Sequence, residues 1–240
     1  MAPIGIQVRD ILAWLERQGS ARNRDGMARY GIVADKVFGV SVGTLRAKGK
    51  ELGRDHDLAL ALWDTGWYEA RMLAAFVDDP AEVTAPQMDR WAKDFDNWAI
   101  CDTLCFHLFD KTPHAWRKID QWSVKRDEFV KRAGFALLAG VALHDKKTPD
   151  KPFLRSLTII EDAATDNRNF VKKGVSWALR TIGHRNENLH EAATATAEKL
   201  AASTDSTARW IGRDALTDLS RPMVKARVAK RGAKAAKARR

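Results

Sequence analysis

The stretch FVKRAGFALL at residues 129–138 begins in the same way as FVKKGVSWAL at residues 170–179. Both open on phenylalanine, place two basic residues at the third and fourth positions, and continue with apolar residues at helical spacing. The aromatic residues Trp67, Trp98 and Phe129 lie 31 residues apart, and Phe170 follows 41 residues later. The pattern indicates a degenerate helical repeat, although amphipathic helices also resemble one another through their common period alone.

Apolar residues recur with helical spacing along nearly the whole chain, and no convincing alternation of polar and apolar residues predicts a strand. We therefore predict an all-α fold. A two-helix repeat of roughly 33 to 47 residues cannot bury its own apolar stripe, so the repeats should stack as an α-solenoid with inner helices beginning near residues 67, 98, 129 and 170. The predicted helices span 6–19, 42–52, 56–65, 67–77, 85–95, 97–109, 114–122, 126–144, 150–165, 168–183, 187–203 and 206–219.

Capping and helix-breaking residues support several of these boundaries. Thr84 three residues before Gln87 predicts a capping box, and Thr112-Pro113 predicts a cap followed by proline at the first helical position. Gly66 and Gly183 predict C-terminal helix ends.

Positive charge is concentrated at the end of the chain. The sequence has 41 basic and 31 acidic residues, a net charge of +10, and residues 221–240 contribute nine basic residues and no acid. We predict a helical domain over 1–220 and a disordered basic segment over 221–240, because a Lys/Arg/Ala-rich run cannot form a core. Such a segment either binds polyanions by counterion release or only increases solubility.

Composition excludes several classes of protein. The chain lacks an apolar run of the roughly 20 residues that a membrane span needs, and its start does not resemble a signal peptide. Cys101 and Cys105 lie four residues apart, which is not the spacing of a disulfide framework, so we expect a cytoplasmic, nucleoid-associated protein that binds no membrane.

Catalytic and cofactor motifs are also missing from the sequence. Phosphate-binding glycine loops, a nucleophile elbow and HExxH are absent. Cys101, Cys105 and His107 provide no good fourth zinc ligand, so we predict no metal or other cofactor and interpret the cysteines as core residues.

In the stretch FDNWAICDTLC at residues 95–105, Asp102 is the one acid within the predicted helix 97–109, which is apolar nearly all round. Asp102 follows Trp98 by one helical turn and would be costly if it were buried in hydrocarbon. A solenoid groove would explain the acid, because Arg71, Arg132 and Lys173 occupy corresponding places on the neighbouring inner helices. The alternative is a structural ion pair between Asp102 and a nearby base.

Nine tryptophans are present against two tyrosines. Most are explained by packing in the core or between repeats. Trp98 and Trp177 lie beside charged residues on expected inner helices, and aromatic rings among cations suit nucleotides. Burial in the core is the alternative for both.

As a set, six stretches resemble the DNA alkylation repair family of AlkD-like, HEAT-like-repeat DNA glycosylases. The resemblance spans residues 27–219 and implies that Asp102 is the catalytic carboxylate, with Trp98 and Trp177 against the lesion nucleotide. It further implies DNA contacts by Arg132, Lys172, Lys173, Arg180 and Arg185, and we expect Arg71 to join them because it has the corresponding register on a neighbouring inner helix. The stretches are MARYGIVADKVFGVSVGTLR, LALALWDTGWYEARMLA, WAKDFDNWAICD, EFVKRAGFALLA, DNRNFVKKGVSWALRTIGHRN and ARWIGRDAL.

The activity implied by the resemblance is that of a monofunctional, monomeric glycosylase that removes N3- or N7-alkylated purines from double-stranded DNA. The first alternative is a non-catalytic AlkD-like module that binds damaged or branched DNA. The second is a protein-binding HEAT-type scaffold, which the near-neutral charge of residues 1–220 favours.

Overall fold

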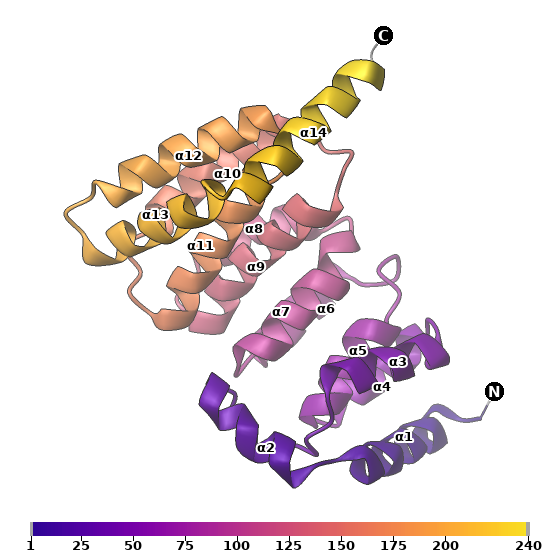
Figure 1. The fold of residues 1–240 in the computed structure, drawn as a ribbon. Coiled ribbons are helices and arrows are strands. Elements are labelled where there is room, and N and C mark those ends of the chain that lie inside the picture. The colour runs from indigo at the N-terminus through magenta and orange to yellow at the C-terminus, as the bar shows by residue number, and fades with distance from the viewer. Residues whose placement is uncertain (1, 239–240) are drawn as a thin grey trace. The chain divides into compact units, whose positions relative to one another are not determined.

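The computed structural model describes the backbone of residues 2–238 and side chains up to residue 231. Fourteen α-helices and two short 3-10 helices account for its regular structure, and no strand occurs in this part of the chain. The all-α prediction is therefore confirmed (Figure 1). The chain divides into two compact units, Met1–His114 (unit 1) and Ala115–Arg240 (unit 2), and each is described by itself.

Unit 1 is built from helix pairs in which large aromatic side chains fill the space between helices. Trp63 on α4 stacks on Trp91 of α6 with ring centroids 4.3 Å apart, and both rings are buried. Helix α5 packs against α3, α4 and α7, so α5 and α7 are neighbours. The elements are α1 (Ile4–Gln18), α2 (Ala21–Met27), η1 (Ala28–Tyr30), α3 (Val42–Leu52), α4 (His56–Asp64), α5 (Tyr68–Val77), α6 (Ala85–Lys93), α7 (Trp98–His107) and η2 (Phe109–Lys111).

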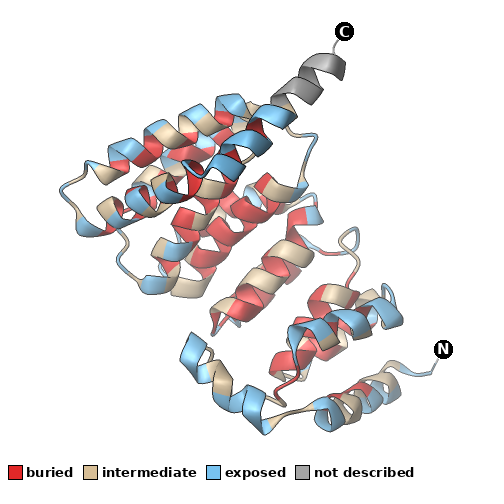
Figure 2. Cartoon of the chain, in the orientation of Figure 1, coloured by how far each residue is buried: buried red, intermediate tan, exposed pale blue. Residues whose placement is uncertain are grey.

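Unit 2 repeats the same principle over a longer series of helices. Helices α9, α11 and α13 pack side by side, while α8, α10 and α12 cover them and α14 lies on α12 and α13. Buried residues follow the contacts between these helices (Figure 2), with Trp122, Phe135 and Phe153 among the largest. The elements are α8 (Ala115–Trp122), α9 (Glu128–His144), α10 (Asp150–Ala163), α11 (Asn169–Gly183), α12 (Glu187–Ala201), α13 (Ser206–Leu219) and α14 (Pro222–Ala238).

All twelve predicted helices are present, with boundaries that shift by at most two residues. Helices α5 and α7 pack together in unit 1, and α9 and α11 do so in unit 2, as expected of the inner helices of a repeat. Two helices, α2 and α14, were not predicted. None of the described helices has the length and apolar content that a membrane crossing requires.

The basic segment expected to be disordered from residue 221 begins as a helix. Val224 and Val228 lie one turn apart on α14, and they are only 5% and 3% exposed. Their burial extends the packed domain past residue 220, because two valines on one face of a helix provide an apolar contact that base-rich composition conceals. The side chains of residues 232–240 lie outside the described part of the chain.

Two sequence signals for helix ends, a capping box and a glycine stop, are confirmed. The capping box is confirmed: the Thr84 hydroxyl accepts from the Gln87 amide, and the Gln87 side chain accepts from the Thr84 amide, both at 3.2 Å. Gly66 has a φ of 71°, and its amide donates to Trp63 O just beyond α4, as a glycine stop requires.

Two other predicted helix ends were wrong in detail. Residues 113 and 114 form a turn and α8 starts at Ala115, because the Thr112 hydroxyl donates backward to Phe109 O and does not cap the helix. Gly183 is the last residue of α11 and not a stop beyond it. A Cβ at Gly183 would stand 2.6 Å from Leu219 Cδ2 and 3.1 Å from Ala193 Cβ, so α11 lies close to α12 and α13 at this glycine.

Candidate nucleic-acid interface

Helix α7 in unit 1 has a single partly exposed stripe. Ala99, Ile100, Cys101, Leu104 and Cys105 are buried. In contrast, residues 98, 102, 103, 106 and 107 are partly exposed, and three of these follow one another at four-residue spacing along one side of the helix. Asp102 therefore lies on this stripe and not in the apolar core of α7.

Two contacts fix the first turn of α7. The buried Asn97 side chain caps the helix by accepting from Ala99 N and Ile100 N, each at 3.0 Å. The Trp98 indole Nε1 donates to Tyr30 O at 2.8 Å, across 68 residues of sequence. Trp98 therefore has a fixed orientation one turn before Asp102.

The segment that provides the Tyr30 carbonyl is itself held on α5. The fully buried Glu69 carboxylate accepts from three successive backbone amides, those of Phe38, Gly39 and Val40, at 2.6 to 3.1 Å. Three donors satisfy a buried carboxylate that would otherwise be costly. Glu69 thus anchors the chain that runs from α2 to α3 beside the start of α7.

The two cysteines of α7 are packing residues. Cys101 and Cys105 are both fully buried and unoxidised. Burial raises the pKa of the Cys105 thiol well above its usual range, with Cys101 and the charge of Asp102 adding to the effect. A thiol in this state is a poor nucleophile and a poor metal ligand. Among the residues whose side chains are described, no group of three histidine, cysteine or acidic residues could hold a metal ion.

Arg71 on α5 is occupied by packing and hydrogen bonds. Its guanidinium lies 4.9 Å from the Trp63 ring centroid, and its Nη2 lies 3.5 Å from an Asp94 carboxylate oxygen. The same Asp94 oxygen accepts from Trp63 Nε1 at 2.9 Å. Arg71 also lines a hollow of about 220 Å³ with Lys36 and Tyr68. The side chain is 18% exposed, so Arg71 helps to order the α4–α6 region.

In unit 2, α11 presents the lysines and the tryptophan that the sequence singled out. Lys172 Nζ lies 5.0 Å from the ring centroid of Trp210 on α13. Lys173 is exposed and Trp177 is partly exposed. A cation beside an aromatic ring on the surface of neighbouring helices suits a nucleic-acid backbone and its sugars.

Arg132 lies between α9 and α11 and is only 6% exposed. Its Nη1 donates to Phe170 O at 2.7 Å, and its stem lies 3.5 Å from where a Cβ on Gly174 would stand. The Arg132 side chain therefore packs against α11 at Gly174. The expected open contact between Arg132 and a phosphate is replaced by helix-to-helix packing.

Arg185 was expected to face DNA, but it contacts the protein's own backbone. Its guanidinium donates to Ala142 O at 2.8 Å, Asp145 O at 2.5 Å and Thr148 O at 3.1 Å. It also lies 3.9 Å from the Phe153 ring centroid. Burial lowers the pKa of Arg185. Arg185 therefore ends α9 and orders the α9–α10 connection, because the last carbonyls of a helix need donors from elsewhere.

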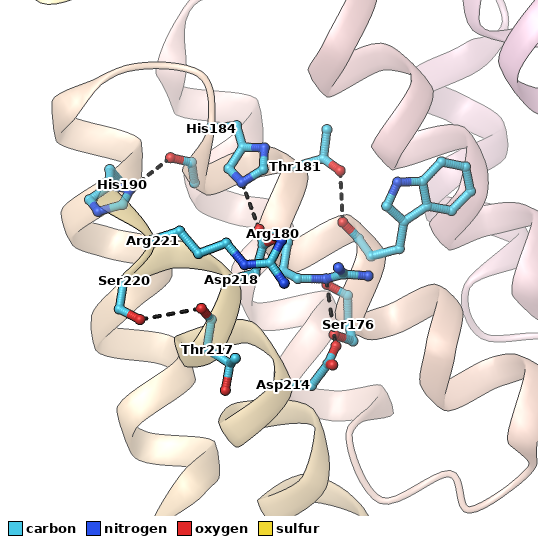
Figure 3. A network of polar contacts seen from close by, with 12 residues as sticks. Ser176, Arg180, Thr181, His184, His190, Asp214, Thr217, Asp218, Ser220 and Arg221 are labelled. Carbon is cyan, nitrogen blue, oxygen red and sulfur yellow. Dashed lines mark hydrogen bonds and ion pairs between the residues drawn. The ribbon is translucent and has the colours of Figure 1, made fainter. Parts of the chain in front are cut away.

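Arg180 belongs to a polar network on α11 and α13 (Figure 3). Its Nε donates to Ser176 O at 3.3 Å and lies 3.6 Å from Asp214, whose carboxylate accepts from the Ser176 hydroxyl at 2.5 Å. Further along the same helices, His184 Nε2 lies 2.7 Å from Asp218 Oδ2. Burial lowers the pKa of His184, against the opposing effect of Asp218.

The structure divides the predicted site residues into two groups. Arg71, Trp98 and Asp102 belong to unit 1, and the other six belong to unit 2. Sequence reasoning did not single out Trp210, which is 37% exposed beside Lys172. The spacing of aromatic residues could have predicted it, because Trp210 follows Phe170 by 40 residues and so continues that spacing.

Each unit is a stack of paired helices with partly exposed aromatic and charged residues, on α7 in unit 1 and on α11 and α13 in unit 2. These features define an α-helical repeat protein, and the lysines and tryptophans of unit 2 form a candidate polyanion surface. The model of the DNA alkylation repair enzyme family matches residues 11–219, and the chain belongs to this family. No curated protein sequence gives a significant match.

A solved structure supports the same fold. It is described as a new family of proteins related to the HEAT-like repeat DNA glycosylases with affinity for branched DNA structures. The two chains are 20% identical and superpose with a TM-score of 0.76 over 92% of this chain and 95% of the other. At this identity the similarity establishes the fold, and the function must be argued from the residues.

Proposed function

We propose that this protein is a DNA glycosylase that hydrolyses the N-glycosidic bond of N3- or N7-alkylated purines in duplex DNA. The observation on which the proposal depends is the position of Asp102 on the partly exposed stripe of α7, one turn after the oriented Trp98. Membership of a DNA alkylation repair family supports this choice of substrate.

The chemistry needs only one carboxylate. A purine alkylated at N3 or N7 is cationic, so it leaves as a neutral base and requires little protonation. As the bond breaks, positive charge builds on the deoxyribose, and a preorganised carboxylate stabilises that charge. Asp102 would also orient the attacking water, which adds to the sugar carbon and loses a proton to solvent. Ordinary glycosidases need two carboxylates because their leaving groups are neutral before cleavage.

The remaining residues take supporting roles in this proposal. Trp98, one turn before Asp102, would pack on the sugar of the lesion nucleotide. In unit 2, Trp177 would pack on a nucleotide, and Lys172 and Lys173 would hold phosphates. Arg132 would act through the α9–α11 contact, because its side chain is buried there. Arg71, Arg180 and Arg185 would maintain the helices that present these side chains.

The test is release of 7-methylguanine from a methylated duplex under single-turnover conditions. Asp102→Asn should slow release by about 10²-fold or more while DNA binding is retained, since the substitution removes an interaction made only in the transition state. Asp162→Asn is the matched control, because it makes the same change at an exposed position on α10 and should leave the rate unchanged. Equal rates for wild type and Asp102→Asn would reject the catalytic role.

A second candidate is a non-catalytic module that binds branched or damaged DNA. It is favoured by the fold shared with the solved structure described as having affinity for branched DNA. The same experiment separates the two proposals if a four-way junction is added as a binding substrate. Tight junction binding by a wild-type protein that releases no methylated base would establish the second function.

A further inference from the structure

Helix α14 has one buried side and one exposed side. Val224 and Val228 are buried against α12 and α13, while Lys225, Arg227 and Lys230 are exposed. Helix α14 contains no acidic residue. None of these three basic side chains forms an ion pair with the residues whose side chains are described. The described part of α14 therefore presents positive charge from a fixed helix and not from a loose segment.

Polar contacts hold α14 near both ends of its described part. At its start, Arg221 Nη1 lies 3.3 Å from Asp218 Oδ1, and the other oxygen of Asp218 lies 2.7 Å from His184 Nε2 (Figure 3). Further along, Arg231 Nη1 donates to the backbone carbonyl of His184 at 2.5 Å. Arg221, just before α14, and Arg231 on α14 thus contact the same end of α11, directly or through Asp218.

The charges around α14 favour one side for a ligand. Between α12 and α14 lies a groove of about 840 Å³ with an acidic wall that includes Glu187, Glu191 and Glu198. Lys225 lines this groove, whereas Arg227 and Lys230 do not. An anion would be repelled from the glutamates and attracted to the opposite side of α14.

We propose that α14 is a second DNA-binding element, in which a docked helix holds Arg227 and Lys230, on the side away from the acidic groove, against the phosphate backbone and Asp218 acts as a positioning residue. The proposal extends the DNA binding of the proposed function but does not require base excision. A membrane surface is a poorer ligand, because an interfacial helix inserts its apolar face and here Val224 and Val228 are already covered.

The test compares removal of charge with removal of docking in the full-length protein. Binding to an undamaged 20-base-pair duplex is measured by fluorescence anisotropy at several salt concentrations. Replacing Arg227 and Lys230 together by alanine should reduce the slope of log K against log salt by up to about 1.8, at about 0.9 for each phosphate that is no longer neutralised. Affinity at low salt should fall by roughly tenfold or more.

A second set of variants, the docking variants, removes the contacts that hold α14 on the protein but keeps or increases its positive charge. Val224→Ser with Val228→Ser leaves the charge unchanged, and Asp218→Asn makes the protein one charge more positive. Both variants should expose α14 to trypsin and weaken DNA binding by roughly three- to tenfold, since the basic side chains of an undocked helix must be ordered again when DNA binds. Val124→Ser, a neutral change at a side chain that is 76% exposed, is the control and should match wild type.

Several results would overturn the proposal. Wild-type affinity in the double alanine variant of Arg227 and Lys230 would show that α14 does not contact DNA. Docking variants that expose α14 but bind DNA as wild type, or more tightly, would show that the segment acts as an unstructured polycation. Unchanged trypsin cleavage in both docking variants would show that these contacts do not hold α14. Binding to vesicles of anionic phospholipid in preference to duplex would identify a different ligand.

Discussion

Arg185 offers the sharpest separation between a structural arginine and a DNA contact. Arg185→Met keeps most of the aliphatic stem but removes three hydrogen bonds to backbone carbonyls and the contact with Phe153. A buried hydrogen bond from a charged donor contributes about 1.5–3 kcal/mol, and we take about 1 kcal/mol for each because the side chain is only partly buried. The ring contact adds about 0.5–1 kcal/mol. The expected loss of unfolding free energy is therefore about 3.5–4 kcal/mol.

The assay is urea denaturation followed by tryptophan fluorescence, combined with the salt dependence of DNA binding below the unfolding transition. Arg185→Met should lower the unfolding midpoint and leave the salt slope unchanged. Lys173→Met is the comparison, because Lys173 is exposed. It should leave the unfolding midpoint unchanged and reduce the salt slope of DNA binding. Wild-type stability in Arg185→Met, together with a salt slope reduced by about one, would refute the assignment of Arg185 to helix termination.

Three further predictions test other parts of the structure. Trp98→Phe removes the donor to Tyr30 O, and we expect single-turnover base release to slow by roughly fivefold for about 1 kcal/mol of lost orientation, with no change in the salt slope of binding. Asp166→Asn should destabilise the protein by about 1 kcal/mol at pH 7. Hydrogen bonding from Arg168 holds the pKa of Asp166 far below its usual value, so this contribution is complete above about pH 4 and declines as the pH falls from there toward the pKa of the folded state. Denaturation of wild type and variant at about pH 7 and about pH 2.5 should show the gap narrowing on acidification. Gly134→Ala should lower stability by about 1–3 kcal/mol, because its Cβ would stand 2.6 Å from a backbone nitrogen at the end of α8. An increase in melting temperature, as helix propensity alone would give, would contradict that close approach.

Helix positions were predictable because they depend on local periodicity. The boundaries of α3 match the prediction, and the Thr84 capping box formed as its sequence implies. Helix α2 was missed because its seven residues are mostly polar and none is buried, so no apolar stripe marks it. Helix α14 was missed for a related reason, since only Val224 and Val228 interrupt a run whose composition is typical of a disordered polycation.

The candidate site was predictable in its identities but less so in its roles. Asp102 and Trp98 were singled out by one-turn spacing, and both lie on the partly exposed stripe of α7. The bond from Trp98 to Tyr30 could not be foreseen, because nothing in the sequence relates residues 68 positions apart when their partner is a backbone carbonyl.

The sequence by itself determined that this protein is a chain of helices in repeated pairs, with Asp102 and several basic residues at inner-helix positions. Only the tertiary structure decided what those bases do: Arg132 and Arg185 contact backbone carbonyls of neighbouring elements, whereas Lys173 is exposed. The physical reason is that a helical pattern specifies which face a residue occupies, while burial and hydrogen-bond partners depend on helices that pack from distant parts of the chain.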